Sequence, residues 1–236
     1  MPVVDILPSP LYIEECPFHS QVKRLFLEEI ERQEGTSITN PSSESLTHID
    51  HYSVLGNDSF ARFRTWVEGQ AEIYVKDVLG RYLPEGMLIT DSWLNVCNEE
   101  GHQTPHFHAN SIVSALYYIN FDEEKHSPTF FTRPQLGQNY PHYPALQMPY
   151  CKNTRYNQLD QVKGREGALF MWEASVVHGF KTNTHPNRVT LAMNLMPTVI
   201  SNGDYGWKVT PLNENERKKH VTEFREGRLW DTPDWY

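Results

Sequence analysis

The feature that most limits the possible folds is a series of short apolar segments that begins at residue 87. The segments cover residues 87–97, 111–121, 168–172, 176–180 and 188–196. Each is rich in β-branched and aromatic residues, and turn residues separate one segment from the next. Short strands at this density are typical of a sandwich or a barrel. We therefore expect this part of the chain to form a β-sheet core.

Two amphipathic helices are predicted before these strands. The first has an apolar face that consists of Val22, Leu25, Phe26 and Ile30. It should end at Gly35, and the second helix should run from about residue 59 to residue 82 with Asp58 as its N-cap. The apolar stripe of the second helix consists of Phe60, Phe63, Val67, Ala71, Tyr74, Val78 and Tyr82. Both stripes indicate packing on the outside of a sheet, and residues 36–58, rich in Ser, Thr, Asn and Gly, are expected to be a loop.

We expect a single domain over residues 1–236. Residues 1–86 would supply an N-terminal strand and helical support, residues 87–200 the β core, and residues 201–236 a C-terminal extension. Residues 133–167 hold four prolines and four tyrosines without a clear periodicity. A long segment of this kind inside a compact domain is typical of a functional loop.

The composition argues against several classes of protein. The formal net charge is −9, so a nucleic-acid partner is not expected, because contacts between basic residues and phosphates dominate such binding. No stretch approaches the roughly 20 apolar residues of a membrane-spanning helix, and the N-terminus lacks the pattern of a signal peptide. Cys16, Cys97 and Cys151 are too widely spaced for a disulfide framework or a zinc site. We expect a cytoplasmic protein.

Two histidines close together in the sequence indicate a metal site. Residues two apart in a strand point to the same face, so His106 and His108 would point the same way, with Phe107 opposite. A third ligand must come from elsewhere in the chain. The best candidate is His178, which lies in the apolar segment 176–180, where an unpaired histidine is costly to bury.

Arg188 follows His178 by ten residues and shares a predicted strand face with Thr190. A guanidinium can bind a carboxylate through two hydrogen bonds, and a neighbouring hydroxyl can donate one more. This pair suits the distal carboxylate of a small dicarboxylate. Three metal ligands combined with a carboxylate site are what a 2-oxoglutarate oxygenase requires, although such iron sites commonly use two histidines and one carboxylate.

A resemblance to a known family covers approximately residues 87–197. Its first part consists of Ser92, Trp93, Leu94, Asn95, Gly101, His106, Phe107, His108, Ser111, Ser114, Tyr117 and Tyr118. Its second part consists of Gly167, Ala168, Leu169, Phe170, His178, Gly179, Arg188 and Asn194. These runs resemble the 2OG-Fe(II) oxygenase family known from marine bacteria and tailed phages. Two positions depart from the family pattern, because Ala115 replaces the usual Gly and Ala109 the usual Pro.

The resemblance implies a fold, a set of cofactors and their ligands. The fold would be mainly β with flanking helices (α+β), around a double-stranded β-helix, jelly-roll or cupin-like, as in the related prolyl 4-hydroxylases. His106, His108 and His178 would be the catalytic metal ligands for Fe(II). Arg188 with Thr190 would bind the C5 carboxylate of the cosubstrate 2-oxoglutarate, and O₂ would be the oxidant. A phage-encoded chain would act in the host cytoplasm.

The sequence leaves the roles of three residues open. Tyr117 and Asn95 are candidates for contact with the cosubstrate. Because Tyr117 and Tyr118 are adjacent in a strand, only one of them points inward, and core packing is the alternative role for Tyr117. His108 stands where most relatives outside this family have Asp or Glu. Its alternative is a place beside the ligand set, with water or another side chain completing the site.

The predicted activity is hydroxylation of an unidentified substrate with release of succinate and CO₂. The substrate is a small molecule or a peptide, and a peptidyl proline is one candidate by analogy with prolyl hydroxylases. The alternative from another class is a non-catalytic, cupin-like module that binds a metal or ligand, which would not need Arg188. A zinc hydrolase is disfavoured, because no acidic residue lies in a general-base pattern near the histidines. The sequence does not define an oligomeric state, and a homodimer formed through the helices is one alternative.

Overall fold

The structure, a computed structural model, describes residues 9–33, 37–49, 53–132, 160–201 and 203–210. The chain divides into two compact units, residues 1–197 and 198–236. The expected division into one domain with helical support, β core and extension stays a prediction.

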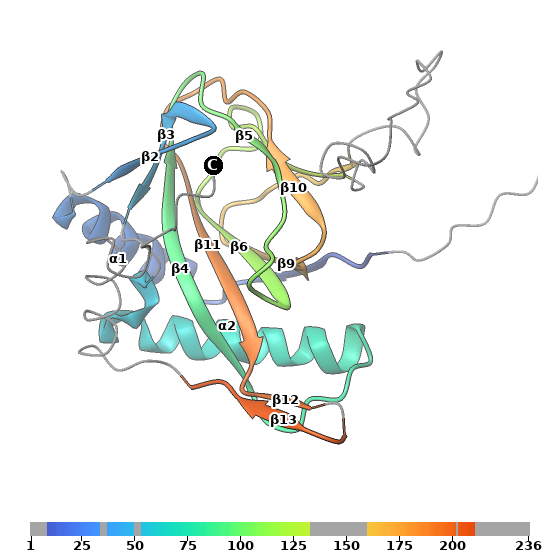
Figure 1. The fold of residues 1–236 in the computed structure, drawn as a ribbon. Coiled ribbons are helices and arrows are strands. Elements are labelled where there is room, and N and C mark those ends of the chain that lie inside the picture. Colours follow the sequence, from blue (N-terminus) through green and yellow to red (C-terminus); the bar gives the residue numbers. More distant parts are fainter. Residues whose placement is uncertain (1–8, 34–36, 50–52, 133–159, 202, 211–236) are drawn as a thin grey trace, which may run out of the picture. The chain divides into compact units, whose positions relative to one another are not determined.

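A seven-stranded antiparallel sheet is the main element of the first unit (Figure 1). Its strands follow the order β1-β9-β6-β11-β4-β3-β2. They are β1 (Tyr12–Glu15), β2 (Ile38–Asn40), β3 (Ser43–Ile49), β4 (Met87–Cys97), β6 (Val113–Asn120), β9 (Ala168–Glu173) and β11 (Arg188–Pro197). The two longest strands, β4 and β11, pair along their whole lengths in the middle of the sheet. The five predicted strand segments are therefore confirmed, four of them in this sheet and the fifth as β10 of the second sheet.

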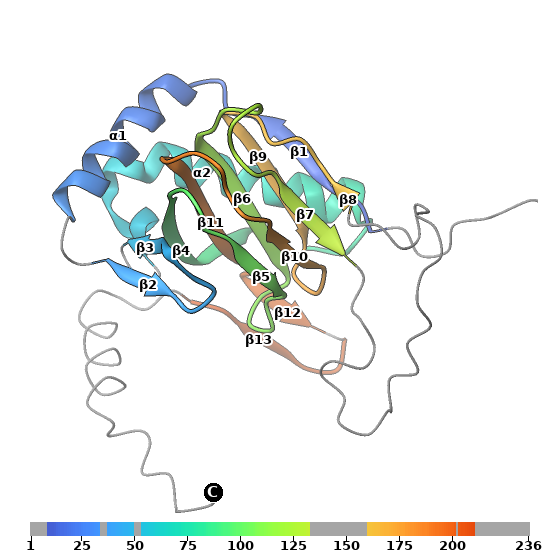
Figure 2. The same cartoon turned by 90° about the horizontal axis from the view of Figure 1, so that it is seen from above.

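A second, four-stranded sheet covers one face of the large sheet (Figure 2). Its order is β5-β10-β7-β8. The strands are β5 (Gln103–His106), β7 (Thr129–Thr132), β8 (Asp160–Gln161) and β10 (Val177–Phe180). Phe131 of β7 packs with Leu116 and Tyr118 of the large sheet in one apolar cluster. In the small sheet itself, His106 lies directly opposite His178, so strand pairing alone brings two predicted ligands together.

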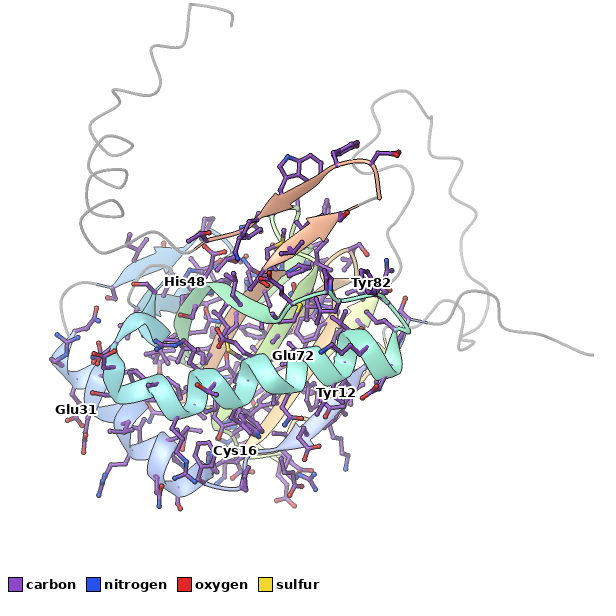
Figure 3. All side chains as sticks on the ribbon, turned by 90° about the horizontal axis from the view of Figure 1, so that it is seen from below. Tyr12, Cys16, Glu31, His48, Glu72 and Tyr82 are labelled. Carbon is purple, nitrogen blue, oxygen red and sulfur yellow. The ribbon has the colours of Figure 1, made fainter. Side chains whose placement is uncertain are left out.

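Two helices cover the other face of the large sheet (Figures 1 and 3). They are α1 (His19–Arg32) and α2 (Ala61–Ile73), and a π-helical turn, η3 (Tyr74–Val78), continues α2. Phe26 and Phe63 from the helices pack with Leu191 and Met193 of β11 in the largest core cluster. Both predicted helices are present, and the mainly β architecture with flanking helices is the one observed. The second helix ends at Val78 instead of residue 82, and Asp58 is not its N-cap, because Asn57 caps the 3₁₀ turn that contains Asp58.

The alternation of side chains along β11 explains how one strand serves both the core and a site. The odd-numbered residues from Val189 to Leu195 belong to the cluster against the helices. Arg188, Thr190 and Ala192 point to the opposite face and line a pocket between the sheets. Since both faces are covered, β11 is buried along most of its length, and its sequence is apolar apart from Arg188, Thr190 and Asn194.

The prediction of a loop over residues 36–58 was wrong. This region contains β2 and β3, followed by two short 3₁₀ turns, η1 (Val54–Gly56) and η2 (Asp58–Phe60). Strand β3 pairs with β4 near the edge of the sheet, and only Leu46 and Ile49 among its side chains are buried. The side chains of β3 are mostly polar and show little alternation, so the sequence alone does not indicate a strand. Backbone pairing with β4 stabilises it as one, because strand preference depends strongly on context.

The second unit contains a two-stranded antiparallel sheet of β12 (Val199–Ser201) and β13 (Gly206–Lys208). Most of the predicted functional loop, residues 133–159, and the C-terminal residues 211–236 lie outside the described residues. Within the described parts of the chain, no helix is long and apolar enough to cross a membrane.

Candidate metal and cosubstrate site

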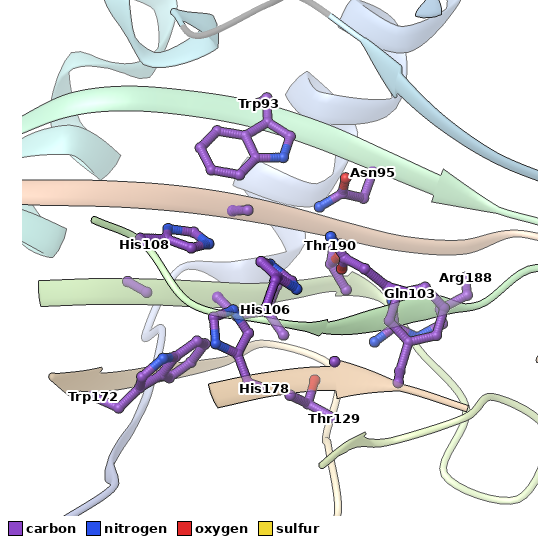
Figure 4. A pocket seen from close by; sticks show the side chains of 15 residues that line it. Trp93, Asn95, Gln103, His106, His108, Thr129, Trp172, His178, Arg188 and Thr190 are labelled. Carbon is purple, nitrogen blue, oxygen red and sulfur yellow. The ribbon is translucent and has the colours of Figure 1, made fainter. Parts of the chain in front are cut away.

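A pocket between the two sheets contains the predicted site residues except Tyr117, and Figure 4 shows three histidines at one end and Arg188 at the other. It encloses about 420 Å³, its open mouth included. The side chains that line the pocket are Trp93, Asn95, Gln103, His106, His108, Ala115, Leu116, Thr129, Trp172, His178, Gly179, Phe180, Arg188, Thr190 and Ala192.

The three predicted ligands form one compact cluster. His106 is the last residue of β5, His108 follows two residues later, and His178 lies on β10. The ring centroids are 4.4 Å apart for His106 and His178, 5.1 Å for His108 and His178, and 5.3 Å for His106 and His108. One ligand atom from each residue lies within 4.8 Å of the other two, a separation that suits a shared metal ion.

Hydrogen bonds donated by the three Nδ1 atoms define how the rings face the site. His106 Nδ1 lies 2.9 Å from the carbonyl oxygen of Thr104, and His178 Nδ1 lies 3.0 Å from that of Val176. His108 Nδ1 contacts Oδ1 of Asn194. All three partners are oxygen acceptors, so each Nδ1 must carry the proton and each Nε2 keeps a free lone pair. A tautomer fixed in this way is the usual arrangement for a metal-binding histidine.

Burial keeps the three imidazoles neutral. It is the largest cause of the lowered pKa of His178, about 3, to which the neighbouring His106 and His108 also contribute. Burial is also the largest cause of the lowered pKa values of His106 and His108. Near neutral pH the cluster therefore presents three unprotonated nitrogens, the form that binds a metal.

Arg188 supplies a buried positive charge at the other end of the pocket. Only 1% of its surface is exposed. Its Nε–H donates to the carbonyl oxygen of Ser127 at 2.9 Å, and its guanidinium lies 4.0 Å from the centre of the Phe180 ring.

Among the described residues no carboxylate pairs with Arg188, and its Nη2 has no hydrogen-bond partner. Burial lowers the pKa of Arg188, and a cation left without a partner is costly. The arrangement therefore calls for an anionic ligand.

Polar side chains next to Arg188 are also without partners. Within the described part of the chain, Thr190 Oγ1 and Asn95 Oδ1 are buried and make no hydrogen bond. Thr190 pairs in register with Asn95 on one side and with Tyr118 on the other, so these side chains form one row across three strands. Ala192, in the next row of the sheet, lines the pocket as well. A ligand with a carboxylate at this end and apolar carbons beyond it would match both rows.

Residues 91–194 match the model of a family described as "Putative 2OG-Fe(II) oxygenase". Over these residues the chain is similar to the 2OG-Fe(II) oxygenase family. The matched region contains the three clustered histidines, Arg188 and Asn95. No curated protein matches the chain in sequence.

Solved structures of 2OG oxygenases have the same fold at low sequence identity. The epimerase SnoN from nogalamycin biosynthesis has a TM-score of 0.59 at 12% identity, over 88% of this chain and 90% of that one. HygX from Streptomyces hygroscopicus, with nickel, 2-oxoglutarate and hygromycin B bound, has a TM-score of 0.54 at 15% identity, over 89% and 90%. A Pseudomonas putida prolyl-4-hydroxylase has a TM-score of 0.53 at 12% identity, over 79% and 92%. The predicted double-stranded β-helix core is thereby confirmed.

The cofactors of the 2OG-Fe(II) oxygenases are Fe(II) and 2-oxoglutarate, and the pocket fits both. The described residues contain one cluster of three metal-binding side chains, and it lies in this pocket. The unpartnered Arg188 Nη2 and Thr190 Oγ1 are donors for a carboxylate at the far end. The departure from the common non-haem iron site is His108, which gives three neutral imidazoles in place of two imidazoles and a carboxylate.

The expectation that Tyr117 contacts the cosubstrate is contradicted. Tyr117 points to the helix-covered face of β6, where its hydroxyl lies 2.7 Å from His19 Nδ1 and its ring packs against Phe63. The adjacent Tyr118 faces the small sheet instead, with its hydroxyl 2.8 Å from Thr129 Oγ1. Asn95 does line the pocket, as expected.

Sequence reasoning missed the direction of Tyr118, although a signal existed. One set of alternate residues in β6 is uniformly apolar or aromatic, whereas the other set begins with Ser114 and ends with Asn120. A polar set is the one expected to face a site, and Tyr118 belongs to it. Trp172 and Asn194 were not predicted as pocket neighbours, since their proximity depends on strand register.

Proposed function

We propose that this oxygenase hydroxylates a substrate C–H bond, with His106, His108 and His178 as ligands of Fe(II) and Arg188 as the anchor for 2-oxoglutarate. The observation that carries the proposal is the buried Arg188, whose Nη2 has no partner among the described residues in a pocket that ends at three neutral histidines. A metal-binding module without this cosubstrate would have no use for such a cation.

The metal and the cosubstrate, when bound, supply the redox chemistry, in which 2-oxoglutarate, O₂ and the substrate C–H bond yield succinate, CO₂ and an alcohol. The protein binds, orients and excludes water. The three Nε2 atoms hold the metal, and the guanidinium of Arg188 with the hydroxyl of Thr190 holds the C5 carboxylate. Asn95 is placed to accept a hydrogen bond beside them. Trp172 and Phe180 close the apolar walls, which keeps the reacting centre dry.

The substrate is a small molecule or a peptide. Structures with this fold include an epimerase and a prolyl-4-hydroxylase, so the fold by itself does not choose between these classes. A peptidyl proline is one candidate to be tested, alongside small molecules.

The test is an anaerobic titration of the Fe(II)-loaded protein with 2-oxoglutarate, followed by the weak visible absorption band of the metal–cosubstrate complex. We expect the band in the wild type and a much weaker affinity in Arg188→Lys, which keeps the charge but loses the planar two-point donor. Ser114→Ala is the control, because Ser114 is buried on the same sheet and does not line the pocket. Absence of the band in iron-loaded wild type would leave only the binding-module alternative. Where the band is present, measuring succinate formation with a panel of peptides and small molecules would identify the substrate.

A further inference from the structure

We infer that Asn194 is a positioning residue for His108 and links this histidine to the carboxylate of Asp91. The inference rests on the proposed role of His108 as a metal ligand. Asn194 lies on β11 with 4% of its surface exposed. Its Oδ1 contacts His108 Nδ1 and lies 3.4 Å from Ser111 Oγ.

His108 differs from the other two histidines in how its ring is held. His106 and His178 each bond through Nδ1 to the backbone carbonyl two residues earlier, Thr104 and Val176, so their own local backbone orients them. His108 lies beyond the end of β5, and its ring instead depends on a side chain 86 positions away in the sequence. The orientation of His108 is therefore the one that a single distant substitution can remove.

The orientation of the Asn194 amide follows from its partners. Its Nδ2 lies 3.3 Å from Asp91 Oδ2 and 3.5 Å from Asn110 Oδ1, and both of these atoms are acceptors. The amide oxygen must therefore face His108, where it can accept only from an Nδ1–H group. This bond leaves Nε2 of His108 unprotonated and directs it at the other two histidines. Asp91 and Asn194 are also register partners on β4 and β11, so the sheet itself fixes their contact.

The contacts from His108 through Asn194 to Asp91 bring a carboxylate close to a metal site that has no carboxylate ligand. Three neutral imidazoles leave a divalent metal one unit more positive than two imidazoles and a carboxylate would. In many metal sites a carboxylate bonds directly to the ligating histidine and increases its basicity. Here the amide of Asn194 lies between His108 and Asp91, so the carboxylate polarises the histidine through one intervening group.

The experiment is a Co(II) titration of the metal-free full-length chain, followed by the visible absorption of bound Co(II). For Asn194→Ala we expect a loss of affinity of about 10- to 100-fold, the usual effect of removing a partner of a metal ligand. Ser114→Ala is the matched control, because Ser114 is the register partner of Asn194 on β6 and makes no hydrogen bond among the described residues. Its affinity should equal that of the wild type. An equal affinity for both variants would overturn the inference.

A second variant separates positioning from a merely structural role. In the exchange Asn194→Asp with Asp91→Asn, one carboxylate and one amide remain, the acceptor for His108 is kept, and the cross-strand bond can form in reverse. We expect this double variant to recover the wild-type Co(II) affinity. Asn194→Asp alone places two carboxylates side by side and should recover less. If the exchange leaves the affinity as low as Asn194→Ala does, the contact with Asp91 is not the one that matters.

A double-mutant cycle tests whether Asn194 acts through His108. On the His108→Ala background, Asn194→Ala should cause no further loss of Co(II) affinity, whereas independent effects would add. The midpoint of thermal unfolding of each metal-free variant reports any general loss of structure. If His108→Ala binds Co(II) as well as the wild type does, the ligand set of the proposed function fails. If His108→Ala weakens binding and Asn194→Ala does not, only the present inference fails.

Discussion

Several polar side chains of the pocket are buried without a hydrogen-bond partner among the described residues. Thr190 is the simplest example. Its hydroxyl is fully buried and makes no hydrogen bond in the described part of the chain. A buried polar group in this condition lowers stability. Such a group persists where a ligand uses it, since stability is often given up at functional sites.

Thr190→Val tests this trade-off with a nearly isosteric change. We expect the affinity for 2-oxoglutarate to fall about 5- to 10-fold, which corresponds to the loss of one hydrogen bond of about 1 kcal/mol. The ligand-free protein should become more stable, because the unpartnered hydroxyl is gone. Isothermal titration of metal-loaded protein and chemical unfolding measure the two effects. An unchanged affinity would remove Thr190 from the carboxylate site, and Co(II) affinity, which should not change, is the control.

The histidines make the stability of the metal-free protein depend on pH. The pKa of His178 is lowered to about 3, against about 6.5 in an unfolded chain. Between these values the unfolded state binds a proton that the folded state does not, so stability falls as the pH falls. For His178 the limiting slope is about 1.4 kcal/mol per pH unit. Urea unfolding from pH 7.5 down to pH 4.5 should show this loss, and His178→Phe should make the dependence weaker. An equally steep dependence in that variant would refute the assignment.

At the residue level, most of the candidate site could be predicted from the sequence. His106, His108, His178 and Arg188 are residue types with distinct chemistry, and their spacing of two along a strand or their place in an apolar run made them visible. Asn194 was visible only as part of a family pattern. Its contact with His108 depends on where β11 lies beside the segment after β5, and no local pattern records that register.

At the level of elements, strands covered on both faces were easier to predict than edge strands. Strands β6 and β11 are mostly apolar, whereas β3 is held by pairing with β4 and was mistaken for a loop. The four-residue strand β7 was also missed, because so short a segment has little periodicity. The pairing of β5 with β10 brings His106 next to His178. It also leaves no space for a side chain at one position of β10.

That position is Gly179 on β10. A Cβ atom added there would lie 2.6 Å from the carbonyl oxygen of Gln103 and 3.2 Å from that of Thr104, both in β5. Gly179→Ala should push β5 away from β10 and separate His106 from His178. We expect a fall in Co(II) affinity of tenfold or more, together with a stability loss of about 1–3 kcal/mol from overpacking.

The same substitution elsewhere provides the control for Gly179→Ala. Gly69 lies in α2, and a Cβ atom added there would meet nothing within 4 Å. Gly69→Ala should stabilise the protein by about 0.5–1 kcal/mol through helix propensity and leave Co(II) affinity unchanged. A Gly179→Ala protein that is less stable but binds Co(II) normally would mean that the close contact serves packing alone.

For the first unit as a whole, the site lies where two sheets meet, so its ligands connect parts of the fold that are distant in sequence. His106 and His178 belong to the small sheet, whereas Arg188 and Thr190 belong to the large one. The fold class could be predicted from strand density and the family resemblance. The assignment of each strand to one of the two sheets could not, because it depends on long-range pairing.

A ligand that contacts both sheets should couple them. We expect metal and 2-oxoglutarate together to slow hydrogen exchange in residues 103–108, 177–180 and 188–191, and to raise stability by about 2.7 kcal/mol at a ligand concentration 100 times the Kd. Amides of α2 that exchange by local opening should not change, since α2 packs on the other face of the large sheet. In Arg188→Lys, 2-oxoglutarate should add little protection beyond that given by the metal alone. Equal protection in wild type and variant would mean that the cosubstrate binds without reaching the large sheet, and the proposed pose would then be wrong.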